Sequence, residues 1–154
     1  MQNRKLAKQL NVLLSDYKLY LHKLLNYQWT IQAYATPEIS EAIIDRAEYV
    51  EEQIDDLVSH VLHLGAVPVG NLGDCFRKTD LSLKVKATSA KEILQNIETD
   101  WYIIEKKVQR LASLQTKESN LSRLKNWFQK ALNQTKKVRQ QFRKQIREET
   151  FSLN

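Results

Sequence analysis

The chain has 154 residues, of which 42% are hydrophobic, which is enough for one domain with a buried core and excludes a chain that is disordered as a whole. Only three glycines and two prolines are present, too few for a turn-rich β architecture, so the composition favours an all-α fold. The formal net charge of +6 is uneven, because residues 1–80 carry more acids than bases and residues 81–154 carry sixteen Lys and Arg against seven Asp and Glu.

Cys75 is the only cysteine, which excludes an intramolecular disulfide framework and a thiolate cluster for zinc. The first residues are polar and basic, and no apolar run approaches the roughly 18 residues of a membrane span. We therefore expect a cytoplasmic protein without a membrane partner. The sequence contains no Gly-rich phosphate loop and no Ser-His-Asp set, so no motif indicates a small-molecule substrate.

Apolar residues recur in steps of three and four through the first part of the chain, which predicts a helix over about residues 3–32. Thr36-Pro37-Glu38 then has the form of a helix start, with an N-cap hydroxyl, a proline at the first helical position and an acid in the first turn. The same apolar spacing predicts a second helix over residues 37–64.

All three glycines lie within residues 65–73 together with Pro68, and they end the second helix and open one long connection, in which a short helix fits. A capping pattern from Ser89 begins a third helix over residues 89–114. A polar break separates it from a fourth helix over residues 119–148, and the tail beyond is expected to be loose. This order predicts one ferritin-like four-helix bundle with a long crossover between helices 2 and 3, a single domain spanning residues 1–154.

Several short motifs carry a resemblance to a known family. Tyr27-Gln28-Trp29-Thr30, Gln53-Ile54-Asp55, Leu64-Gly65 followed by Pro68, and the start of the third helix at Ser89 resemble the corresponding stretches of the Dps family of mini-ferritins. The resemblance implies a dodecamer, a hollow shell of twelve subunits that serves in stress response. It also implies iron oxidation by peroxide at sites shared between two subunits and, in many members, DNA bound to the outer surface.

The resemblance places the five iron ligands of the family at Gln28, Ser40, Ile44, Asp55 and Ser59. Only Asp55 is a competent ligand, because neutral Gln and Ser bind Fe(II) weakly and Ile cannot bind it. One carboxylate does not hold two irons, so we expect a degenerate ferroxidase site, no catalytic residue and no enzyme. The opposing hypothesis is an iron-oxidising and iron-storing mini-ferritin with an unconventional metal site.

Such a site would combine Asp55 with neighbouring acids and with histidines. The only sequence-local set of metal-ligand types is Asp56, His60 and His63, which share one helical face at i, i+4 and i+7. The competing interpretation is a polar face at the end of the bundle. None of the histidines follows a Glu by three residues, so the Glu-x-x-His pairs of carboxylate di-iron bundles are missing.

The second and fourth predicted helices carry opposite charge. The second is strongly acidic, and the fourth has nine cations and no acid between Ser119 and Arg147. These cations either pair with the acidic second helix of the same or a neighbouring subunit, or bind the phosphates of DNA. The nucleic-acid candidates are Arg4, Lys5, Lys8, Lys136, Lys137, Arg139, Arg143, Lys144 and Arg147.

These observations predict a Dps-like homo-oligomeric shell, expected to hold twelve subunits, that acts in DNA protection or binding or as a structural cage. A third hypothesis is a bundle that binds a protein partner and forms no cage.

Overall fold

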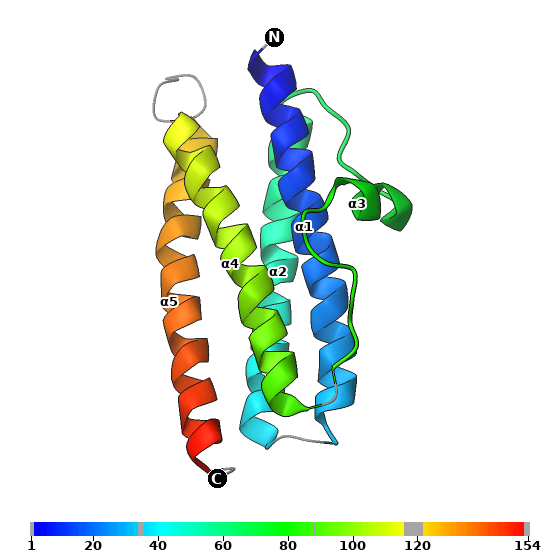
Figure 1. The fold of residues 1–154 in the computed structure, drawn as a ribbon. Helices are drawn as coiled ribbons and strands as arrows, with labels where there is room; N and C mark the ends of the chain where they lie inside the picture. The colour runs from blue at the N-terminus through cyan, green and yellow to red at the C-terminus, as the bar shows by residue number, and fades with distance from the viewer. Residues whose placement is uncertain (1, 34–35, 88, 116–121, 153–154) are drawn as a thin grey trace. The chain divides into compact units, whose positions relative to one another are not determined.

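The computed structural model describes residues 2–33, 36–87, 89–115 and 122–152 (Figure 1). All regular secondary structure in these ranges is helical, and none of the helices is long and apolar enough to cross a membrane. By its internal contacts the chain divides into two compact units, residues 1–93 and 94–154. The helices are α1 (Gln2–Ile31), α2 (Pro37–His63), α3 (Leu72–Lys78), α4 (Ala90–Gln115) and α5 (Ser122–Ser152).

The fourth long helix differs most from the expected bounds. Its expected start at residue 119 lies outside the described residues, and α5 continues to Ser152, beyond the end expected near Glu148. No glycine or proline occurs between these two residues to stop the helix. The tail is therefore helical as far as Ser152. The long connection contains α3, the short helix for which it had room.

The start of α2 was predicted to be capped by the Thr36 hydroxyl. Thr36 is indeed the N-cap residue, with extended backbone, and Pro37 occupies the first helical turn, but the Thr36 side chain makes no capping hydrogen bond. The capping hydroxyl was therefore a wrong prediction. The fixed φ of Pro37 is compatible with helical geometry without that bond.

The end of α2 depends on Gly65, whose φ of 78° lies in the left-handed region. Its N–H donates to the carbonyl of Leu62 at 2.9 Å, and the N–H of Ala66 donates to the carbonyl of Val61 at 3.2 Å. These two bonds form a Schellman motif, which closes a helix and favours glycine because a Cβ would strain this conformation.

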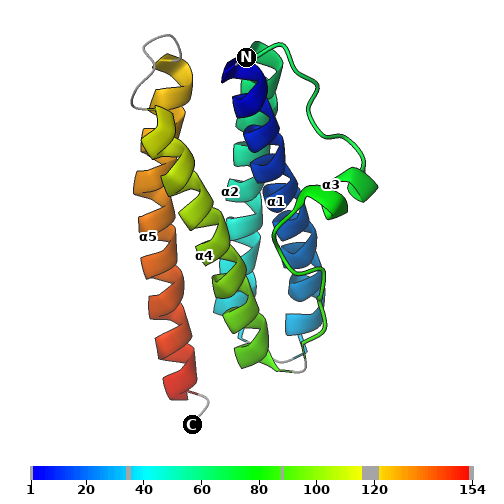
Figure 2. The same cartoon turned by 45° about the horizontal axis from the view of Figure 1, so that its top comes forward.

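In the first unit α1 and α2 run side by side, and α3 lies against α1 (Figures 1 and 2). Leu10, Leu13, Tyr17, Leu24 and Ile31 of α1 are fully buried, which follows from their spacing of three, four and seven residues on one helical face. The same apolar face was expected from the sequence pattern.

The long crossover is attached to α1 by four polar side chains that the helix pattern did not single out. Asn11 donates to the carbonyl of Val67 at 3.0 Å and accepts from the N–H of Val69 at 2.9 Å. Further along α1, Asp16 accepts from the Thr79 hydroxyl at 2.7 Å and from the N–H of Asp80 at 2.9 Å. The ammonium groups of Lys18 and Lys23 donate to the carbonyls of Val69 and Ser82 at 2.6 and 2.9 Å.

Asn11→Ala is expected to lower the free energy of unfolding by about 1–3 kcal/mol, because it leaves the buried N–H of Val69 without its acceptor. Asn11→Asp keeps an acceptor for the N–H of Val69, and its protonated carboxyl also keeps a donor for the carbonyl of Val67, so it should cost less than Asn11→Ala at low pH. Urea unfolding followed by circular dichroism measures both. Equal unfolding midpoints for wild type and Asn11→Ala would contradict this assignment.

In the second unit α4 and α5 lie side by side (Figures 1 and 2). Trp101, Ile104 and Val108 of α4 are fully buried, and Phe128 of α5 is 1% exposed. The indole Nε1 of Trp101 donates to the carbonyl of Thr135 at 3.4 Å, which joins the two helices at mid-length.

Candidate functional site

The five positions that correspond to iron ligands do not come together in one chain. Gln28 lies near the end of α1, and Ser40 and Ile44 lie in the first turns of α2, at the same end of the helical hairpin. Asp55 and Ser59 lie eleven and fifteen residues beyond Ile44 on α2, about 16 and 22 Å further along the helix axis. Only two copies of the chain can bring both groups into one site.

The chemistry of these side chains does not fit a di-iron centre. Gln28 and Ser40 are half-buried, whereas Ile44, Asp55 and Ser59 are exposed. Asp55 is the only one of the five that carries a negative charge, and two irons need several carboxylate or imidazole ligands. These five positions therefore lack the ligands that iron oxidation at a di-iron centre requires.

The alternative set on α2 does not form a metal-binding group either. Asp56 and His63 are exposed and His60 is half-buried. Over the described ranges, no three or more His, Cys, Asp or Glu side chains are placed to hold a metal ion. A shared helical face is thus not enough to bind a metal ion within one subunit through Asp56, His60 and His63.

Exposed apolar side chains lie at the same end of the α1–α2 hairpin as the first group of ligand positions. Trp29 is 69% exposed, and Leu25 and Ile44, at the same end of the α1–α2 hairpin, are 37% and 36% exposed. An exposed tryptophan beside two aliphatic side chains is typical of a surface that another molecule covers.

Tyr49, one turn before Gln53 on α2, has a strongly perturbed phenol. Burial raises the pKa of Tyr49 to about 12, Arg46 opposes the shift, and the carboxylates of Glu52 and Asp56 add to it. The neutral phenol is therefore favoured by the folded state over the unfolded state, in which the pKa is 10.0.

The resulting contribution to stability is fully present below pH 10.0 and is lost as the pH rises through about 12. The phenolate absorbance of wild type and of Tyr49→Phe is measured as the pH is raised. The difference between the two proteins reports Tyr49 alone and should increase near pH 12. A difference that titrates near the ordinary phenol value would contradict the burial of this group.

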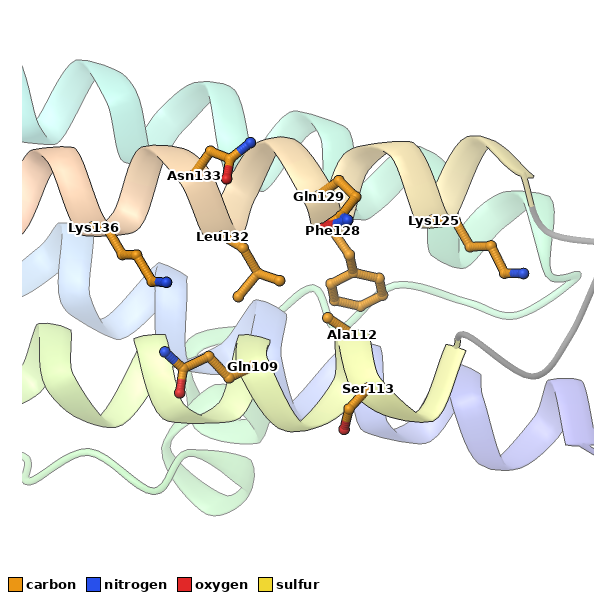
Figure 3. A pocket seen from close by; sticks show the side chains of 9 residues that line it. All are labelled: Gln109, Ala112, Ser113, Lys125, Phe128, Gln129, Leu132, Asn133 and Lys136. Carbon is orange, nitrogen blue, oxygen red and sulfur yellow. The ribbon is translucent and has the colours of Figure 1, made fainter.

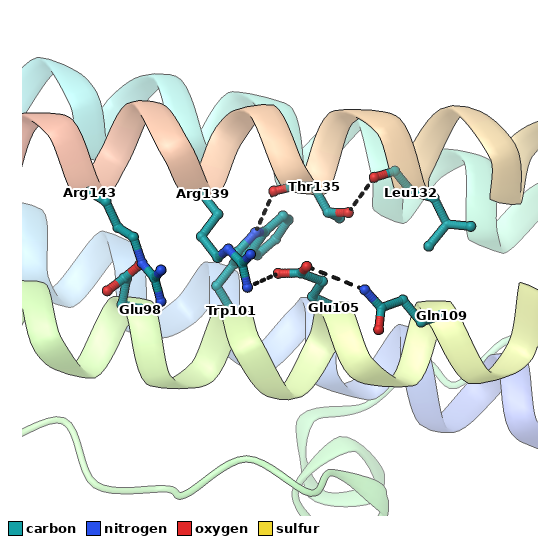
Figure 4. A network of polar contacts seen from close by, with 8 residues as sticks. All are labelled: Glu98, Trp101, Glu105, Gln109, Leu132, Thr135, Arg139 and Arg143. Atoms are coloured by element: carbon teal, nitrogen blue, oxygen red, sulfur yellow. Dashed lines mark hydrogen bonds and ion pairs between the residues drawn. The ribbon is translucent and has the colours of Figure 1, made fainter.

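Two of the candidate DNA-binding cations have partners in α4 (Figure 4). Nη1 of Arg139 lies 3.3 Å from Oε2 of Glu105, and Nε of Arg143 lies 2.6 Å from Oε1 of Glu98. Within this chain both arginines therefore pair with acids of α4, and not with the acidic second helix as one of the two hypotheses expected. Glu98 and Glu105 were missed, although their seven-residue separation places both on one face of α4.

Glu105 also joins a longer polar row between the two helices. It is 2% exposed, and Nε2 of Gln109 donates to its Oε1 at 3.4 Å. On the α5 side the Thr135 hydroxyl donates to the carbonyl of Leu132 at 2.9 Å (Figure 4). Arg139 therefore serves packing between α4 and α5 and is a poor candidate for binding a phosphate.

Other α5 cations border a groove or are exposed elsewhere on the helix. Lys125 and Lys136 border a groove of about 590 Å³ between α4 and α5, into which Phe128 and Leu132 point (Figure 3). No acid lines this groove. Lys137, Lys144 and Arg147, like Lys136, are exposed. The other groove residues are Gln109, Ala112, Ser113, Gln129 and Asn133.

The basic start of the chain belongs to a helix. Arg4, Lys5 and Lys8 are exposed on the first turns of α1, which begins at Gln2. These three cations are therefore presented on a fixed helical surface.

Comparisons with known proteins agree on the fold. The family model described as "Ferritin-like domain" matches residues 7–150. The fold is similar to that of Dps from Vibrio cholerae (16% identity, TM-score 0.85, covering 94% of this chain and 91% of that one). It is also similar to Dps from Staphylococcus aureus (18% identity, TM-score 0.81, covering 93% and 95%).

A dodecameric thioferritin from Bacteroides fragilis, described as a bacterioferritin-related protein, is 13% identical with a TM-score of 0.86, covering 95% of this chain and 86% of that one. No curated protein matches the sequence. The expected all-α, ferritin-like bundle with one long crossover is confirmed.

Proposed function

Because the chain belongs to the ferritin-like family, we propose that it is a Dps-type shell subunit without a working ferroxidase centre. The observation that carries the proposal is the ligand set, in which Asp55 is the only charged residue at five positions and Ile44 cannot bind a metal. The fold shared with Dps proteins supports the shell, and the substitutions oppose iron oxidation. A cytoplasmic location accords with the single free, buried Cys75.

Assembly is supported by the exposed apolar patch at Trp29. A soluble monomer gains nothing from an indole that is 69% exposed, whereas burying it between copies removes apolar surface from water. The similar thioferritin is described as dodecameric. Twelve chains of 18.1 kDa would form a particle of about 220 kDa.

Light scattering after size exclusion tests the shell directly. Wild type should elute as one large closed species, and Trp29→Glu should shift it toward smaller species. Leu83→Glu, which changes a 54% exposed residue of the crossover, is the matched control and should leave the mass unchanged. A monomer of 18.1 kDa at every concentration would exclude a shell.

DNA binding is a second candidate function, favoured by the excess of exposed cations. Lys136, Lys137, Lys144 and Arg147 are exposed on α5, which has no acid between residues 122 and 147, and many copies would add weak phosphate contacts into high avidity. Gel-shift titration should show retardation that weakens steeply as salt increases. No retardation at low salt would assign these cations to protein contacts.

A further inference from the structure

The exposed cations of α5 form a regular line. Arg123, Lys130, Lys137 and Lys144 follow one another at seven-residue intervals, and Arg147 continues the line three residues later. Asn126, Asn133 and Gln140 occupy the intermediate positions, so the steps are three and four residues throughout. All eight side chains are exposed, and none is acidic or apolar. We call this line the basic stripe.

An acidic line with the same repeat runs along α2. It consists of Glu38, Glu41, Asp45, Glu48, Glu52 and Asp55, at alternating steps of three and four residues. All six are exposed, on the side of α2 away from the buried Ile43, Val50 and Leu57. We call this line the acidic stripe.

Neither stripe is neutralised within the described parts of its own chain. No charged side chain of either stripe has a hydrogen bond or an ion pair with another described residue. The neighbouring Arg139 and Arg143, by contrast, are paired with acids of α4. Like charges three and four residues apart on a helix repel each other. Each stripe therefore gains stability from a surface of opposite charge.

We propose that the acidic stripe of one copy packs along the basic stripe of a second copy. The acidic stripe spans 18 residues and the basic stripe 25, or about 26 and 36 Å of helix from first to last residue. Both keep the average spacing of 3.5 residues that holds two helices in contact over such a length. DNA would match only the basic stripe, whereas a second copy explains both.

The chemistry of the contact is an alternation of ion pairs and amide hydrogen bonds. Carboxylates accept from Lys and Arg and also from the amide groups of Asn126, Asn133 and Gln140. Each copy presents both stripes, so the contact uses different surfaces on the two partners and repeats from copy to copy. The inference thus rests on the proposed shell and names one of its interfaces.

Charge reversal in the full-length protein tests the contact. Lys130→Glu with Lys137→Glu reverses the basic stripe, and Asp45→Lys with Glu52→Lys reverses the acidic stripe at the same seven-residue spacing. Each pair should weaken association by about tenfold or more in sedimentation velocity at about 50 mM NaCl. The variant with all four changes should regain assembly, because the opposite charges again face each other.

Lys91→Glu with Arg110→Glu is the matched control, since both residues are exposed on α4 and lie outside the stripes. Circular dichroism verifies that every variant is folded. Assembly of both reversed variants at wild-type strength would overturn the inference while leaving the shell intact. A wild type that is monomeric at low and high salt would overturn the shell as well.

Two further outcomes would also overturn the inference. If reversal of the basic stripe abolishes DNA retardation and leaves assembly unchanged, the stripe is a nucleic-acid surface. If reversal lowers the unfolding temperature and leaves assembly unchanged, the stripes are neutralised within one chain. Restored assembly in the variant with all four changes is the result that supports the contact between copies.

Discussion

Trp101→Ala is expected to lower the free energy of unfolding by about 3–5 kcal/mol. Trp101 is among the largest fully buried side chains, with 0% of its surface exposed, and its removal leaves a cavity that the surrounding helices fill only in part. It also removes the hydrogen bond from Nε1 to the carbonyl of Thr135. Chemical unfolding at one fixed protein concentration measures the loss, since the proposed assembly would make stability depend on concentration.

Trp101→Phe is the control that separates packing from hydrogen bonding. It retains an aromatic ring and loses the indole N–H, so its cost should be clearly smaller than that of Trp101→Ala. A loss below about 1 kcal/mol for Trp101→Ala would show that this side chain is not at the centre of a packed core.

Glu105→Ala is the second change with a large expected effect and should lower the free energy of unfolding by about 3 kcal/mol. Glu105 has 2% of its side chain exposed, and its removal leaves the guanidinium of Arg139, itself 27% exposed, without an opposite charge. The same change removes the acceptor for Gln109. Partial solvent contact at Arg139 limits the loss.

Glu98→Ala provides a matched comparison on the same helix. Its partner Arg143 is 50% exposed, so removing this ion pair should cost between about 0 and 1 kcal/mol. Thermal unfolding of the two variants in parallel measures the difference. Equal losses would contradict the conclusion that burial distinguishes the two ion pairs.

The long helices could be predicted from the sequence because their apolar residues repeat over many turns. The Schellman end at Gly65 was also signalled, since glycine is favoured where φ is positive. The continuation of α5 to Ser152 could not be predicted, because the tail is polar and no stop residue marks its end. The Thr36 hydroxyl was expected to cap α2 on the basis of its residue type alone, and it makes no capping hydrogen bond.

The candidate site was predictable only in part. The motif around Gln28 and Trp29 located the ligand positions, and their chemistry could be judged from residue type. The pairing of Arg139 with Glu105 depends on how α4 packs against α5, which no local pattern contains. The role of Asn11 and Asp16 in holding the crossover could not be predicted either. The spacing of residues along a helix does not show which distant backbone groups a polar side chain reaches.

Ferric absorbance after Fe(II) and peroxide are added to purified protein measures whether this chain oxidises iron. We predict a rate equal to that of a protein-free control, with no change in Asp55→Ala. As a positive control, Gln28→His, Ser40→His, Ile44→Asp and Ser59→Glu together should raise the rate, since they supply the missing ligands. Oxidation by wild type well above the protein-free control, abolished by Asp55→Ala, would show that the chain is a ferroxidase and would contradict the prediction.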